Sequence, residues 1–289
     1  METIGESALY SFIDQSGDLK RAKCTQVRNF EGLFVGSYVE LARRVAELQF
    51  RNPEHLFLFR GQKKDYPNAQ KNTMLRPSIL HGKEEKAPSA DVVQRRYHKL
   101  RHAEMRLAEI FNSRGWDFKG YVKRRKIVRW SILQHYGVCG TPLLDVTHSL
   151  RIAASFAEAN ENQEFGYVFV LGVPNLSGAV TASAEASLQA IRLSSICPPQ
   201  AYRPHLQEGY LLGEYPDLDS AEQKLQFKHY EIDFGRRLVG KFRFNPKDFW
   251  RADSSFPMVN DAALYPNNHD EVFAALSELK AEINQELPE

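Results

Sequence analysis

Apolar residues recur at helical spacing in several stretches of the chain. The clearest stretch follows Ser37, where the run LARRVAEL places its apolar side chains on one face. Ser37 is a typical helix N-cap, and Glu40, three residues later, can return a hydrogen bond to the backbone of the cap. The spacing predicts helices over 38–50, 89–112, 121–136, 149–157 and 270–283. The small residues of 149–157 would let that helix pack very close to a sheet.

Other apolar runs are short and predict strands. These runs cover 55–60, 143–147, 167–173, 187–196, 210–212 and 238–244, with a further short strand at 24–27. The run LFLF at 56–59 leads directly into Arg60 and Gly61. An apolar strand therefore ends on a guanidinium that stays charged, which raises the question of what this charge contacts.

The order of the elements predicts an α+β fold. Its core would be a mixed, mostly antiparallel sheet with helices around it. Residues 1–35 are interpreted as an N-terminal lead-in and 36–289 as one domain, because no repeat or linker interrupts them. The helices at about 89–137 are interpreted as a helical insertion. Residues 61–88 are polar and rich in proline, which predicts a surface loop.

Composition narrows the function classes. The chain is 43% hydrophobic and 26% charged, with a formal net charge of +2, which is too mild to indicate a nucleic-acid or membrane partner. A basic helix face over 95–106 would suit a nucleic-acid backbone, but a solvated helix face is the preferred interpretation. Three scattered cysteines argue against disulfides and a cysteine-rich zinc site, and we expect no metal. The absence of a long apolar run or secretion-signal pattern predicts a cytoplasmic protein.

Polar residues interrupt the apolar framework at three places. The first is Arg60-Gly61-Gln62. The second is the run QHYG at 134–137 followed by LLDVTHS at 143–149, and the third is the run around Gln207. Polar groups at the ends of buried elements are candidates for a binding or catalytic site.

These three places, in this order, resemble the FRG domain family, which is named for a Phe-Arg-Gly signature. The resemblance rests on FRGQ at 59–62, on LQHYG at 133–137 and on LLDxTxSL at 143–150. The steps QxGY at 207–210 and ALYP at 263–266 resemble later elements of the family, so the resemblance spans roughly 37–280. This chain has Pro142 and Val146 where the family usually has arginine and tryptophan.

The pattern is also similar, more distantly, to the ADP-ribosyltransferase-like enzymes, which use NAD+ as a substrate. That resemblance implies that Arg60 holds the pyrophosphate of the dinucleotide. It implies that Thr147 and Ser149 lead into a helix beneath the nicotinamide pocket. It further implies that Glu208 or Gln207 assists loss of nicotinamide.

Three other residues complete the candidate site. Gly61 would let the backbone approach the ligand, and Gln62 stands beside it. Asp145 is a further candidate ligand contact, and His135 a candidate catalytic or substrate-orienting residue. Structural roles stay open for each of these groups. Arg60 could pair with Asp145, Thr147 and Ser149 could act as helix caps, and Glu208 could be an ordinary exposed acid.

Three functions follow from these alternatives. The first is an NAD+-using ADP-ribosyltransferase-like or NAD+ glycohydrolase domain, which would suit a toxin or phage-defence effector with an unknown macromolecular acceptor. The second is a non-catalytic module that binds a nucleotide or nucleic acid. The third is an interaction domain. The interaction domain predicts that Arg60, His135 and Thr147 do not share a cavity, whereas the enzyme needs a carboxylate facing the Arg60 pocket.

Overall fold

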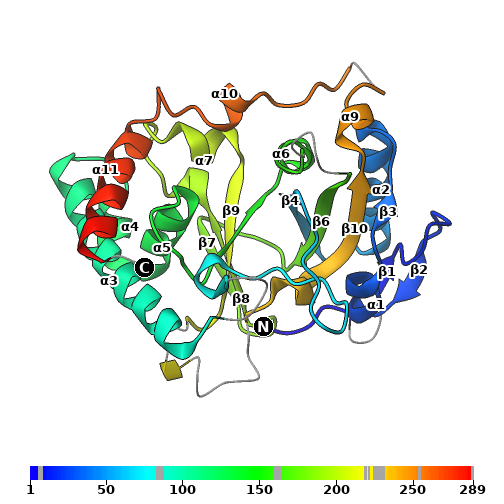
Figure 1. Cartoon of the computed structure of the whole chain (residues 1–289), viewed down its shortest axis with the longest axis horizontal. Helices are drawn as coiled ribbons and strands as arrows, with labels where there is room; N and C mark the ends of the chain where they lie inside the picture. The colour runs from blue at the N-terminus through cyan, green and yellow to red at the C-terminus, as the bar shows by residue number, and fades with distance from the viewer. Residues whose placement is uncertain are drawn as a thin grey trace.

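An open sheet of eight strands runs through the centre of the molecule in a computed structural model (Figure 1). The structure describes residues 1–5, 9–82, 88–158, 164–217, 220, 222–223, 232–252 and 255–287. Within these residues the strand order is β3-β10-β6-β4-β5-β9-β8-β7, and neighbouring strands are antiparallel except β10 and β3. The predicted α+β class with a mostly antiparallel core is confirmed.

The strands agree closely with the apolar runs of the sequence. The sheet strands are β3 (Leu33–Phe34), β4 (Leu56–Gln62), β5 (Leu144–Thr147), β6 (Gly166–Val173), β7 (Val180–Ser183), β8 (Leu188–Arg192), β9 (Gly209–Glu214) and β10 (Leu238–Phe244). A separate hairpin pairs β1 (Leu9–Ser11) with β2 (Lys20–Ala22). Strand β4 runs two residues further than predicted, so Arg60 lies within a strand rather than at its end.

The helices lie on both sides of the sheet. They are α1 (Cys24–Asn29), α2 (Tyr38–Arg51), α3 (Ala90–Ser113), α4 (Lys119–Arg124), α5 (Lys126–His135), α6 (Leu150–Phe156), α7 (Tyr202–Leu206), α9 (Pro246–Phe249), α10 (Asp261–Leu264) and α11 (Glu271–Glu286). In Figure 1, α3, α4, α5 and α11 gather beyond the end of the sheet formed by β9, β8 and β7, whereas α1 and α2 lie beside β10. No described helix is long and apolar enough to cross a bilayer.

Two predictions of local structure are wrong. The expected strand at 24–27 is helix α1, because Cys24, Val27 and Arg28 are buried together at helical spacing and the Gln26 side chain accepts from the Lys23 backbone. The expected helix over 121–136 is two helices, α4 and α5. They are separated at Arg125, whose backbone is extended.

Helix α6 packs unusually close to β4, as its small residues predicted. An ideal Cβ on Gly61 would overlap the carbonyl oxygen of Ala153 and lie 3.0 Å from the backbone nitrogen of Ala157. Ser149 caps the helix by accepting a hydrogen bond from the Ile152 backbone nitrogen. The helix therefore lies directly on the strand that carries Arg60.

The sheet opens between β4 and β5. These strands pair at a single position, Phe59 with Thr147, whereas β4 pairs with β6 along its whole length. Beyond Phe59 the two strands separate, so backbone groups on their facing edges need other partners. The candidate site lies at this opening.

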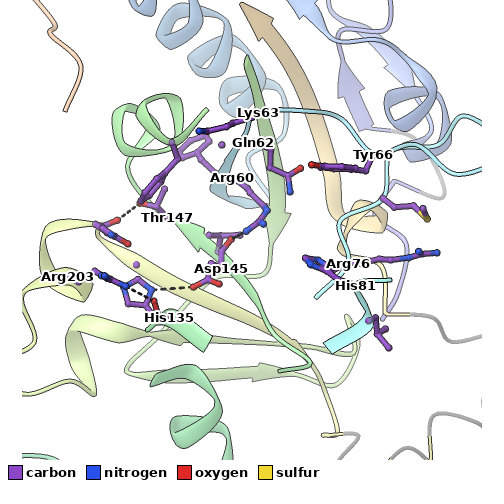
Figure 2. A pocket seen from close by; sticks show the side chains of 18 of the residues that line it. Arg60, Gln62, Lys63, Tyr66, Arg76, His81, His135, Asp145, Thr147 and Arg203 are labelled. Carbon is purple, nitrogen blue, oxygen red and sulfur yellow. Dashed lines mark hydrogen bonds and ion pairs between the residues drawn. The ribbon is translucent and has the colours of Figure 1, made fainter. Parts of the chain in front are cut away.

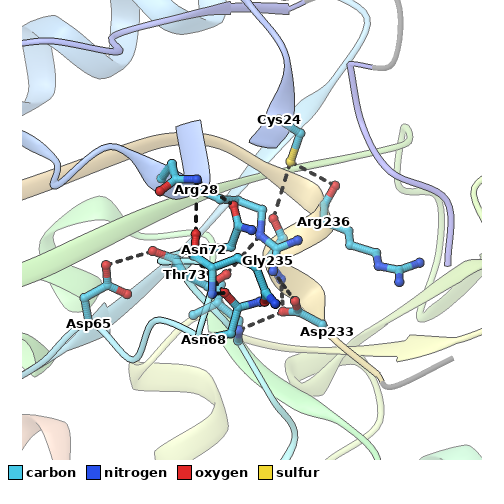
Figure 3. A network of polar contacts seen from close by, with 12 residues as sticks. Cys24, Arg28, Asp65, Asn68, Asn72, Thr73, Asp233, Gly235 and Arg236 are labelled. Atoms are coloured by element: carbon cyan, nitrogen blue, oxygen red, sulfur yellow. Dashed lines mark hydrogen bonds and ion pairs between the residues drawn. The ribbon is translucent and has the colours of Figure 1, made fainter. Parts of the chain in front are cut away.

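A buried polar network holds the first part of the loop that follows β4 (Figure 3). Arg28 forms an ion pair with Asp233 and donates to the carbonyl oxygen of Thr73. Lys241 of β10 donates to the carboxylate of Asp65 at 2.8 Å and to the hydroxyl of Thr73 at 2.7 Å. Buried charges that are paired and hydrogen-bonded in this way tie residues 65–75 to the sheet.

Candidate functional site

A cavity of about 660 Å³ lies where β4 and β5 separate (Figure 2). This first cavity is lined by strands β4, β5 and β9, by the loop after β4, and by residues near the C-terminal helices. Its volume falls within the range of small-molecule sites. Arg60, His135 and Thr147 all line it, which contradicts the expectation of the interaction-domain interpretation.

Arg60 bridges the opening between the two strands. Its Nη1 donates to the carbonyl oxygen of Asp145 at 2.6 Å, and this bond replaces the ladder bonds that β4 no longer supplies. With its amide oxygen turned toward Arg60, Gln62 accepts from Nε at 3.0 Å and from Nη2 at 3.2 Å. A guanidinium has five N–H groups, so one on Nη1 and one on Nη2 are left for a ligand. Burial lowers the pKa of Arg60, and the charge of Asp145 opposes that shift.

Gly61 has a packing role that was not predicted. It lines the cavity, but a side chain there would collide with the backbone of α6. Helix packing alone therefore requires glycine at this position, and the predicted close approach of a ligand stays a prediction.

Asp145 is the carboxylate that faces the cavity. Its Oδ2 accepts from Nε2 of Gln134 at 2.7 Å, its Oδ1 lies 3.3 Å from Nδ1 of His135, and 34% of its side chain is exposed. Partial burial raises its pKa, but the hydrogen bonds from His135 and Gln134 and the charge of Arg60 outweigh this effect. The pKa of Asp145 therefore lies below its ordinary value, and the group is ionised at neutral pH.

His135 is held against this carboxylate at the end of α5. A carboxylate only accepts hydrogen bonds, so Nδ1 of His135 carries the proton. Its Nε2 is buried and has no partner among the described residues. Gly209 makes room for the ring, since a Cβ there would lie 3.2 Å from Cε1 of His135. His135 thus positions Asp145, while its second nitrogen stays unpaired.

The hydroxyls of Thr147 and Ser149 are used within the fold. Thr147 donates to the carbonyl oxygen of Gln207 at 2.7 Å and accepts from the Ser149 backbone nitrogen at 3.0 Å. Thr147 lines the cavity and Ser149 does not, because Ser149 caps α6. Their structural role is to connect β5, α6 and the turn before β9.

The two candidates Gln207 and Glu208 are neighbours in the turn before β9, but their side chains have different surroundings. Gln207 is buried and lines the cavity, but its Nε2 donates to the carbonyl oxygen of Leu264 at 2.6 Å. Glu208 has a positive φ of 45°, is exposed and is not among the cavity-lining residues. Asp145, rather than Glu208, supplies the carboxylate next to Arg60.

The second part of the loop after β4 covers the cavity and makes it positive. Figure 2 shows Arg76 and His81 on the loop segment that faces Arg60 and Asp145. Burial lowers the pKa of His81, and the charges of Arg60, Arg96 and Arg76 add to that shift. The lining residues that the structure describes carry four permanent cations, Arg60, Lys63, Arg76 and Arg203, against one carboxylate. The positive electrostatic potential of these groups attracts anions.

The family model of the FRG domain matches residues 55–165, a segment that includes Arg60, His135 and Asp145. This chain carries an FRG domain. Neither a curated protein nor a solved structure matches it. The more distant resemblance to ADP-ribosyltransferase-like enzymes therefore stays a prediction. The FRG segment supplies β4, the loop after it, α5 and β5, which together form most of the cavity wall.

Residues beyond the matched FRG segment complete the cavity. Arg203 of α7 and Tyr265 line it together with Gln207, and the guanidinium of Arg203 lies 5.4 Å from the ring centroid of Tyr265. Arg203 also donates to Asn267 at 2.8 Å, so it is partly used in packing. Arg203 lies in the polar run around Gln207, and Tyr265 lies in the run ALYP at 263–266. The sequence analysis singled out both runs but assigned neither residue to the site.

Three cavity-lining residues of the loop after β4 lie in a stretch that no sequence pattern singled out. Tyr66, Arg76 and His81 lie in a polar, proline-rich segment without periodicity, and only the fold brings them over the cavity. The described residues contain no cluster of three or more His, Cys, Asp or Glu side chains that could hold a metal ion. The described lining of the cavity offers arginine, lysine, histidine, carboxylate and aromatic side chains.

Acid should weaken the FRG domain through Asp145. Because folding lowers the pKa of Asp145, its contribution to the free energy of unfolding is complete above the unfolded pKa and is lost as pH falls through the folded one. Urea unfolding of the wild type and of Asp145→Asn should give a free-energy difference that is constant from about pH 7 to about pH 5 and shrinks toward about pH 3. A difference that stays constant over the whole range would contradict the low pKa.

Proposed function

We propose that the first cavity binds NAD+ and that the FRG domain cleaves the bond between nicotinamide and ribose. The products would be nicotinamide and ADP-ribose when water is the acceptor, or an ADP-ribosylated macromolecule otherwise. The observation that carries this proposal is that Asp145, an ionised carboxylate, faces the same positive cavity as Arg60.

The charge of the cavity suits a pyrophosphate. Two N–H groups of Arg60 stay available after its three internal bonds, and guanidinium groups bind phosphate oxygens with paired hydrogen bonds. Lys63 and Arg76 add positive charge on the loop that faces Arg60. A dinucleotide with two phosphates would meet this charge at the centre of the cavity.

Aromatic side chains flank the charged centre. Tyr66 lies on the loop after β4, and Phe156 and Tyr265 line the side formed by α6 and the chain after α10. The ring centroids of Phe156 and Tyr265 are 5.9 Å apart in an edge-on arrangement. Planar bases bind well against such rings, so one wall suits adenine and the other nicotinamide.

Asp145 would act on the charge that develops during cleavage. When the bond between ribose C1′ and the nicotinamide nitrogen breaks, its electron pair leaves with nicotinamide and positive charge develops on the ribose. A fixed carboxylate close to that charge stabilises the transition state. Water then adds to C1′ and releases a proton to solvent. Gln134 and His135 would keep the carboxylate in place without reacting themselves.

A non-catalytic nucleotide-binding module is the second candidate. The contacts of Asp145 with Gln134 and His135 favour this candidate. Both carboxylate oxygens already accept hydrogen bonds, as those of a structural carboxylate would. In that case Arg60 and the loop would hold the ligand, and Asp145 would only organise β5. The two candidates agree on binding and differ on bond cleavage.

One experiment separates the two candidates. Purified protein is titrated with NAD+ in a calorimeter, and nicotinamide release is measured by chromatography in a parallel incubation. Binding heat together with nicotinamide release supports the enzyme. Binding heat without release, also in the presence of cell extract as a source of acceptors, supports the binding module. The absence of binding heat would contradict both proposals for NAD+.

A further inference from the structure

A second cavity of about 560 Å³ lies behind the FRG motif at the end of α5. Its walls are α3, α11 and the turn after α5, and Figure 1 shows α3 and α11 side by side at this end of the molecule. The described linings of the two cavities have no residue in common, although Gln134, which lines the second cavity, donates to Asp145 of the first.

The second cavity is positive, and the part of its lining that the structure describes contains no countercharge. Its described lining includes three cations, Arg96, Lys99 and Lys280, and no carboxylate. The thiol of Cys139 also lines it, but burial raises the pKa of this thiol to about 12, so it is neutral. The first cavity has a carboxylate for chemistry, whereas the charged residues among the described lining of the second all attract an anion.

Lys99 is the most informative of these cations. Only 8% of this residue is exposed, and its ammonium donates to the neutral side-chain oxygen of Asn284 at 2.7 Å. No carboxylate among the described residues lies within ion-pair distance of it. Buried ammonium groups normally face a negative charge, because moving an ammonium group out of water costs free energy that an opposite charge offsets. A ligand with negative charge would supply the missing partner.

Arg96 lines the same cavity. Its Nη1 donates to the carbonyl oxygens of Ile79 at 2.9 Å and His81 at 2.6 Å, which fixes the guanidinium. The printed hydrogen bonds use only Nη1, so Nε and Nη2 have no partner among the described residues. These two N–H groups form the edge that binds two oxygens of a phosphate or carboxylate at once.

We propose that the second cavity binds a phosphate group, carried by a small phosphorylated metabolite. The fixed edge of Arg96 and the ammonium groups of Lys99 and Lys280 match the several oxygens and the double charge of a phosphate. The volume exceeds what a single ion needs, because a water molecule occupies only about 30 Å³. None of the described lining residues is aromatic, so recognition of a base is not expected and a sugar phosphate fits better than a nucleotide.

Calorimetry with two probes tests this site. The wild type is titrated at low ionic strength with inorganic phosphate and with ribose 5-phosphate, and the ester should bind more tightly than the free ion. Equal affinity for the two probes would overturn the metabolite as the ligand. Absence of binding by either probe at millimolar concentration would overturn the site.

Three variants locate the binding. Lys99→Met and Lys280→Ala should each weaken binding by about tenfold, because each removes a charged hydrogen-bond donor. Lys123→Ala, an exposed lysine of α4 outside both cavities, is the matched control and should bind as the wild type does. Lys280 is also exposed, so its variant keeps the test valid if Lys99→Met fails to fold. If folded Lys280→Ala binds like Lys123→Ala, the phosphate lies elsewhere and the proposal is wrong.

Discussion

Replacing Asp145 with asparagine is expected to slow nicotinamide release from NAD+ by about 100-fold to 1000-fold, the loss typical of removing one preorganised electrostatic group from an active site. The change keeps the size of the side chain and removes its charge. NAD+ binding should persist, because Arg60 and the loop after β4 provide the positive charge. Calorimetry and chromatography on the same sample would measure both quantities.

Folding of the Asp145 variant needs its own measurement. Gln134 and His135 both donate to this side chain, and an asparagine can accept from only one of them through its single oxygen. Some loss of stability is therefore expected, and the melting temperature shows whether the assay temperature is suitable. Loss of release in a folded variant that still binds NAD+ would assign the effect to the missing carboxylate.

Glu208→Gln tests the competing carboxylate. The sequence pattern made Glu208 a candidate for assisting nicotinamide loss, but the side chain is exposed and does not line the cavity. Release by this variant should match the wild type. If Glu208→Gln loses activity and Asp145→Asn keeps it, the assignment of Asp145 is wrong and the turn before β9 must carry the chemistry.

Replacing Gly61 with alanine is expected to lower the free energy of unfolding by about 3 kcal/mol, at the upper end for added atoms in a packed interior. The new Cβ would overlap the carbonyl oxygen of Ala153 and lie 2.8 Å from its carbonyl carbon. These are backbone atoms, so no change of side-chain rotamer relieves the overlap. Helix α6 would have to move away from β4, and Phe156 in the cavity wall would move with it.

Gly36→Ala is the matched control for this substitution. A Cβ at Gly36 would have Glu40 Oε2 as its nearest neighbour, at an ordinary contact distance of 3.7 Å. Its stability should stay within about 1 kcal/mol of the wild type, the usual size of a glycine-to-alanine effect at a compatible site. Urea unfolding measures both variants. Equal stability of Gly61→Ala and the wild type would contradict the close packing of α6.

Many elements were predictable because their signals are local. The helix after Ser37 begins where its cap predicts, with the Ser37 hydroxyl accepting from the Glu40 backbone nitrogen. Glu40 accepts from Gly36 rather than from the cap residue itself, a small departure from the expected pattern. The apolar strands and the helix after Ser149 were predicted in the same way. Errors arose where burial outweighed propensity, as in α1, and where Arg125 interrupts a continuous helical pattern.

The site was predictable only in part. Arg60, His135 and Asp145 share a cavity because strands β4 and β5 bring distant polar residues together, and their position after apolar runs made them visible in the sequence. The sequence left alternative roles open and could not decide between them. Ser149 serves as a cap and Glu208 is exposed outside the cavity lining, whereas the packing role of Gly61 against α6 was not predicted. Spacing indicates which face of an element a residue occupies, but not which distant partner its side chain meets.

The sequence by itself determined the α+β class, most of the strands and helices, and the FRG motif, because periodicity, caps and signature residues act over a few neighbouring positions. Only the tertiary structure decided that the sheet opens after Phe59, that Arg60 spans the opening, and that Arg76 and His81 face it. It also decided that the carboxylate next to Arg60 is Asp145 and that Lys99 is buried without a negative partner among the described residues. These features depend on contacts between residues far apart in the chain, where packing and electrostatics rather than local preference set the geometry.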